Sequence, residues 1–216
     1  YVISNIGLIG ESAFANCTAM QNATIQNNGT IGASAFKNCS KLQKVRLGNQ
    51  VGDINQRAFY NCVVLDSLAL PNSVKALGDS VFYNCKDLAF TQLSNTLSTI
   101  GNAAFDRCNS LPKIFIPKSV SSIGQGVFRK CSSLSVVGFE DGASPLSLGR
   151  DSVNKGLFYD CPLDSVYIGR ELSYQKTKAY GYSPFYRSAT LRSIVISDVP
   201  TKVETNEFYG CTNLYY

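Results

Sequence analysis

The sequence predicts an α/β repeat solenoid, in which short parallel strands stack into a sheet along one face of a coiled chain. Three observations predict it. A Phe-centred motif recurs along the 216 residues, Gly and Cys keep fixed positions relative to that Phe, and a short alternating apolar run follows each Cys. Self-similarity at a period of roughly 20 to 50 residues is typical of stacked repeat architectures.

The motif is clearest at residues 9–17, IGESAFANC, which return as IGASAFKNC at residues 31–39. Nine Phe residues, 22 to 30 positions apart, mark the copies: Phe14, Phe36, Phe59, Phe82, Phe105, Phe128, Phe158, Phe185 and Phe208. The two longest gaps indicate insertions at 139–156 and 169–184. We therefore expect residues 1–216 to form a single domain of about nine repeats, and to be a segment of a longer array.

A second set of positions precedes each Phe. Five residues before it stands an apolar or aromatic side chain: Ile9, Ile31, Ile54, Leu77, Ile100, Ile123, Val153, Tyr180 and Val203. The next residue is usually Gly, with Asn at 55 and 154. Because Gly and Asn tolerate a positive φ, we expect a tight turn at that position in each copy.

All eight cysteines stand three residues after a motif Phe, and the eighth copy has Ser188 there instead. Equivalent positions in stacked coils form a column with parallel Cβ vectors, which is a poor geometry for disulfides. We therefore expect free, buried thiols. A zinc site would need ligands arranged as a tetrahedron, and a catalytic thiol would need an activating base. Since the chain has no His, the sequence predicts no enzyme, no metal and no cofactor.

The runs after the cysteines predict strands. Residues 42–47, 65–70, 111–116, 163–168 and 191–196 all read L-x-x-Φ-x-Φ, where Φ is apolar. Alternation with a period of two is typical of a strand with one buried face. Stacking such strands in parallel would bury a continuous core, which explains why the same side chains recur in every copy.

The segments CVVLDSLALPNSVKALGDSVF (62–82) and CNSLPKIFIPKSVSSIGQGVF (108–128) resemble the repeat of the BspA-type, or Treponema pallidum-type, leucine-rich repeat family. The resemblance implies a right-handed curved coil with a parallel concave sheet of short strands and an irregular or short helical convex side. It also implies a secreted or cell-surface bacterial protein that takes part in adhesion.

Charge and hydropathy limit the partners. The net charge is +5, but the basic residues are scattered and form no run, so we expect no binding to nucleic acid. No stretch approaches the length of a membrane span, so we expect no direct membrane insertion in this segment.

The outward strand positions are the candidate ligand-binding site, because the inward ones are committed to the core. Two columns, one residue before and one after the central buried position, are expected on the concave face. They contain a basic zone, Lys44, Arg46 and Lys113, and an apolar band, Phe90, Phe115, Val136, Tyr167 and Val195. Thr91 occupies an apolar position, so the alternative that Phe90 turns inward stays open.

The Tyr-rich loop 170–187 is a second candidate site, with Tyr174, Tyr180 and Tyr182 as contact residues. The leading hypothesis is a non-catalytic binding or adhesion module that recognises an extracellular protein or glycan, host-derived ones included, through the concave face and this loop. The alternative is a structural spacer with no ligand of its own.

Overall fold

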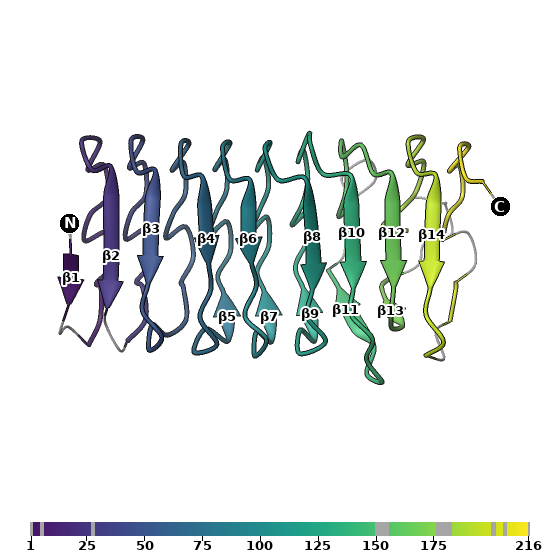
Figure 1. Ribbon diagram of the computed structural model, residues 1–216, viewed down its shortest axis with the longest axis horizontal. Coiled ribbons are helices and arrows are strands. Elements are labelled where there is room, and N and C mark those ends of the chain that lie inside the picture. The colour runs from purple at the N-terminus through teal and green to yellow at the C-terminus, as the bar shows by residue number, and fades with distance from the viewer. Residues whose placement is uncertain are drawn as a thin grey trace.

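The computed structural model describes residues 2–4, 7–26, 29–149, 156–175, 183–199, 202–204 and 207–215, with the backbone alone for 2–4, 90 and 91. These residues form a stack of coils in chain order, each with one strand on the same face (Figure 1). We call this the front face; it is the surface expected to be concave. Its strands are β1 (Val2–Ser4), β2 (Asn22–Gln26), β3 (Lys44–Leu47), β4 (Ser67–Ala69), β6 (Phe90–Gln92), β8 (Lys113–Ile116), β10 (Val136–Phe139), β12 (Ser165–Ile168) and β14 (Ser193–Ile196).

The front strands pair in parallel and in the register that the repeat predicts. Lys113 pairs with Val136, Val136 with Ser165, and Ser165 with Ser193. The side chains at the central position, such as Val45 and Ile114, are buried, while their neighbours face outward. The predicted one-sided burial of the strands is therefore confirmed.

The front face consists of two sheets in the described residues, ordered β1-β2-β3-β4-β6 and β8-β10-β12-β14. Pro112 accounts for the break between β6 and β8. In the other coils the residue at this position donates its N–H to the preceding coil, as Ala89 does to the Asp66 carbonyl (2.9 Å) and Ser135 to the Pro112 carbonyl (3.0 Å). Proline has no N–H to donate, so the ladder loses this bond between the fourth and fifth coils.

A second ladder runs along the back of the stack. It contains the short strands β5 (Ala76–Leu77), β7 (Thr99–Ile100), β9 (Ser122–Ile123), β11 (Leu146–Leu148) and β13 (Leu172–Ser173), and isolated bridges from Ile9 to Leu77 extend it.

This register corrects the sequence alignment of the two inserted coils. Leu148, rather than Val153, pairs with Ile123. Because Leu172 and Ser173 pair with Leu146 and Ser147, Tyr174 rather than Tyr180 follows in the same column. Most of the extra residues therefore come after the back strand, although two of them precede β11. Val153 and Tyr180 themselves lie outside the described residues.

The segment around each motif Phe joins the back strand to the front strand. Of the two expected forms, irregular or short helical, it has the irregular one, and the described residues contain no helix. Alternate amides point to the next coil: Ser34, Phe36 and Asn38 donate to carbonyls of the third coil at 2.7–2.9 Å. The amides between them close tight turns within their own coil. This alternation requires a positive φ two residues before and two after the Phe, as at Ser34 (57°) and Asn38 (61°), which a helix does not permit.

The Gly after the back-strand residue has a different role from the one expected. None of these glycines that the structure describes has a positive φ. Instead, a Cβ on Gly78 would lie 2.3 Å from the backbone nitrogen of Gln56, and one on Gly149 would lie 2.5 Å from that of Gln125. Gly is favoured at this position because neighbouring coils approach closely there, although the third coil has Asn55.

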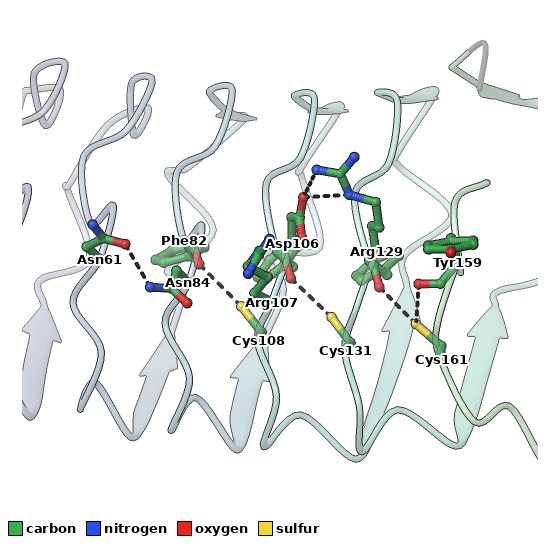
Figure 2. Close-up of polar contacts among 12 residues, drawn as sticks. Asn61, Phe82, Asn84, Asp106, Arg107, Cys108, Arg129, Cys131, Tyr159 and Cys161 are labelled. Carbon is green, nitrogen blue, oxygen red and sulfur yellow. Dashed lines mark hydrogen bonds and ion pairs between the residues drawn. The ribbon is translucent and has the colours of Figure 1, made fainter. Parts of the chain in front are cut away.

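The core between the front and back ladders is built from repeated columns. The nine motif Phe rings stack on one another with centroids 5.2–5.7 Å apart. All eight cysteines are free, as predicted, and most are buried. From the second coil on, each thiol donates to the carbonyl of the Phe in the preceding coil, as Cys108 does to Phe82 at 3.3 Å (Figure 2). This bond explains why a thiol rather than a methyl group fills the column.

Candidate functional site: the front face

On the front face, side chains of the two outward columns that lie on neighbouring strands form straight rows. This is because the strands pair without a register shift on either side of the break. Along one row of the second sheet, Phe115, Gly138, Tyr167 and Val195 are direct neighbours on β8, β10, β12 and β14. Phe115 and Val195 are each 51% exposed, which is high for large apolar side chains on a folded domain. The structure thus brings the second half of the predicted apolar band together.

Phe115 is supported by the glycine beside it. A Cβ added to Gly138 would lie 2.4 Å from Cδ1 and 2.7 Å from Cε1 of Phe115, so the ring lies against the Gly138 backbone. Gly138 is buried as a result, although it occupies an outward position. The sequence contains this signal, a glycine next to an aromatic residue in the same row, but it can be recognised only once the register is known.

A hollow of about 280 Å³ lies on the other side of Phe115, at the break between β6 and β8. Its lining combines apolar and polar groups: Ala89, Gln92, Leu93, Asn95, Pro112, Lys113, Ile114, Phe115, Pro117 and Glu140. Pro112, which accounts for the break, and Phe115, which borders the hollow, lie three residues apart in the chain. The site therefore has an exposed aromatic ring beside a partly apolar cavity, a combination that suits an inserted side chain.

The remaining members of the apolar band differ in accessibility. Val136 and Tyr167 are half-buried. The Tyr167 hydroxyl donates to a carboxylate oxygen of Asp141 at 2.6 Å, and this bond is the main cause that raises the Tyr167 pKa. The backbone of Phe90 lies in β6, but its side chain is outside the described part, so its predicted position stays a prediction.

The three cations of the predicted basic zone are not adjacent. Lys44 and Arg46 are exposed on β3, whereas Lys113 is exposed on β8, three coils further along. With strands about 4.8 Å apart, the two groups are separated by about 14 Å, which exceeds the screening length in physiological salt. Lys113 instead belongs to the hollow next to Phe115.

The loop residues are placed only in part. Tyr174 is half-buried and packs against the core, and burial is the main cause that raises the pKa of its phenol. Tyr180 and Tyr182 lie outside the described residues.

The described residues contain no group of three or more potential metal ligands. Burial raises the pKa of the Cys39 thiol to about 11 and also raises that of Cys85, so these two thiols are protonated and unreactive near neutrality. Nor does the described part of the chain contain a helix that could cross a membrane.

The coil stack, the parallel front ladder and the repeated columns define a leucine-rich-repeat solenoid. The chain belongs to the BspA type leucine rich repeat family, whose model matches residues 7–135, 52–184 and 143–216. Comparison with curated proteins gave no match.

Solved structures agree with this assignment. A leucine-rich repeat protein of T. pallidum is 27% identical with a TM-score of 0.62, and the match covers 73% of this chain and 72% of that one. A leucine-rich cell surface protein from Faecalibacterium prausnitzii is 26% identical with a TM-score of 0.61, over 97% of this chain and 63% of the other. The pneumococcal vaccine antigen PcpA, 20% identical with a TM-score of 0.61, shares the fold over 88% of this chain and 56% of its own.

Proposed function

We propose that the chain is a non-catalytic binding module of a cell-surface or secreted bacterial protein, which recognises an extracellular protein or glycan through its front face. The observation that carries the proposal is the Phe115 ring, half exposed between Gly138 and the hollow at the sheet break. We centre the binding site there.

An exposed aromatic side chain is unfavourable for folding but favourable for binding. Leaving a Phe in water forgoes about 2 kcal/mol of burial, so a row that exposes Phe115 and Val195 needs an explanation. Aromatic side chains beside desolvated cavities are typical energetic centres of interfaces. The fixed register gives the ring a rigid base, because every row is tied to its neighbours by the front ladder.

The surface location is supported by the relatives. The F. prausnitzii protein is described as a cell surface protein, and its match extends over nearly all of this chain. Adhesion to host material is the finer proposal, and the 170–187 loop is kept as a second contact region within it.

The test uses the whole chain and a panel of immobilised extracellular-matrix proteins and glycans. Phe115→Asp should reduce binding to any member that the wild type retains by at least roughly tenfold, since it removes a central anchor. Gly138→Ala should weaken binding less, because the new methyl group pushes the Phe115 ring from its place. Ala69→Asp is the matched control: it adds the same charge at an exposed outward position on β4.

Binding that survives Phe115→Asp in a folded variant, as judged by circular dichroism, would contradict the front-face site and favour the 170–187 loop. If the wild type binds no member of the panel, the spacer hypothesis is favoured.

A further inference from the structure

A second hollow lies on another surface, at the edge where each coil turns from its motif Phe toward the front strand. Its volume is about 340 Å³, and its lining comes from positions directly before or after the column cysteines of four successive coils. We call it the edge hollow. Its lining side chains are all polar: Asn84, Lys86, Arg107, Asn109, Lys130, Ser132 and Asp160.

The residue before the cysteine is Asn in the first four coils, and these amides form a ladder. Asn38 donates to Asn16 at 2.9 Å, Asn61 to Asn38 at 3.1 Å and Asn84 to Asn61 at 2.8 Å. In the next two coils the same position holds Arg107 and Lys130, so the amide ladder ends where the edge hollow begins (Figure 2).

The exchange of Asn for a cation is unfavourable for the fold. Both positions have a positive φ, 65° at Arg107 and 61° at Lys130. Asn tolerates this conformation better than other side chains, and a long side chain held there costs on the order of 1 kcal/mol. Two successive coils thus give up a favourable residue and an amide hydrogen bond beside one hollow. Departures of this kind from local preference concentrate at functional sites.

Little negative charge compensates the cations of the edge hollow, although the Arg107 guanidinium lies 5.9 Å from the centroid of the Tyr83 ring. No ion pair of Lys86 or Lys130 occurs in the described residues. Arg107 lies 4.0 Å from the Asp106 carboxylate, which already accepts hydrogen bonds from the Arg129 guanidinium. Asp160 is the one acid in the lining, against three cations. The Asn109 amide nitrogen, in the orientation that satisfies both groups, donates to the carbonyls of Arg107 and Lys130 and ties the two coils together.

The lining selects among anionic ligands. A protein interface needs an apolar anchor, and single-stranded nucleic acid needs aromatic rings for base stacking, but neither kind of side chain lines the hollow. Cations on three successive coils spread over about 10 Å, which exceeds the size of one inorganic ion. Asn84 and Ser132 add polar groups that suit sugar hydroxyls.

We propose that the edge hollow binds an acidic polysaccharide, with Lys86, Arg107 and Lys130 contacting its sulfate groups. This site lies outside the front strands, and it does not depend on the function proposed for the front face.

The test measures binding of the whole chain to heparin, with desulfated heparin, inorganic sulfate, poly-glutamate and single-stranded DNA as comparison ligands. The Arg107→Asn/Lys130→Asn double variant restores the residue of the preceding coils, so it should fold at least as well as the wild type. Lys41→Asn/Lys75→Asn is the control, since it removes the same charge from exposed positions outside the hollow.

Wild type should bind heparin with an affinity that falls steeply with salt. The hollow variant should lose at least roughly tenfold in affinity and show a shallower salt dependence, whereas the control changes little. The proposal is overturned if wild type does not bind heparin or if the hollow variant binds like the control. It is also overturned if inorganic sulfate, poly-glutamate or DNA binds as tightly as heparin, since each would place a different ligand in the hollow.

Discussion

The regular coils, between residues 31 and 135, and the inserted coils, between 139 and 187, build the same Phe stack with connections of different length. In the regular coils the back residue, the Gly and the Phe keep one spacing. In the inserted coils the back strand stays in register through Leu148 and Leu172, and most of the extra residues come after it. The Phe stack nevertheless continues through Phe158 and Phe185 at 5.6–5.7 Å. The Phe column and the front ladder therefore fix the coils, and the back connection takes up the differences in length.

Arg170 shows how the inserted region compensates for lost regularity. It is buried, and its guanidinium donates to the carbonyls of Pro117, Lys118 and Val120, all in the turn below β8. Burial lowers its pKa. A charged side chain is thus part of the core in the inserted region.

The largest expected effect tests whether the Phe column is equivalent in both regions. Phe82→Ala and Phe185→Ala should each lower the free energy of unfolding by about 4 kcal/mol, because both rings are fully buried between two others. Chemical denaturation measures both. A cost for Phe185→Ala below half of that for Phe82→Ala would contradict the continuity of the column.

The next effect concerns the compensation by Arg170. Arg170→Met should cost about 3 kcal/mol, since it leaves buried carbonyls without donors while keeping most of the side-chain volume. Arg192→Met is the control: Arg192 is exposed and pairs with Asp164 at 3.5 Å, so its loss should cost less than about 1 kcal/mol. Equal losses in thermal or chemical unfolding would show that Arg170 has no special role.

A smaller difference in stability is expected between glycine substitutions in the two regions. Gly78→Ala should cost about 2 kcal/mol because the new Cβ meets the backbone of the preceding coil. Gly156, in the inserted region, has no atom within 4 Å of an added Cβ, so Gly156→Ala should change stability by less than about 0.5 kcal/mol. The midpoint of urea unfolding distinguishes the two, and a tolerated Gly78→Ala would mean that the coils are less closely packed than described.

Most of the features that recur in every coil could be predicted from the sequence. The strands, the outward and inward positions, the Phe column and the free thiols all follow from a fixed period. The sequence did not predict the positive φ at Ser34 or Asn38, because Ser and Asn are common in many kinds of turn. It also misjudged the reason for the Gly, since close approach of two coils cannot be read from one coil.

Features that occur once in the chain were harder to predict than features that recur in every coil. The sheet break at Pro112, the support of Phe115 by Gly138 and the burial of Arg170 each depend on contacts between coils that differ from the consensus. In the insertions, Val153 and Leu148 are both apolar and either could occupy the back-strand position by sequence alone. Only the pairing of the back ladder shows that Leu148 does so.

We propose that one repeat scaffold carries two independent binding surfaces, at Phe115 and at the edge hollow. The most direct measurement is binding of Phe115→Asp and of Arg107→Asn/Lys130→Asn to two probes, the matrix-panel member that wild type retains and heparin. We expect the first variant to lose binding only to the matrix-panel member and the second only to heparin. Loss of both probes in either variant, or of neither in both, would contradict it.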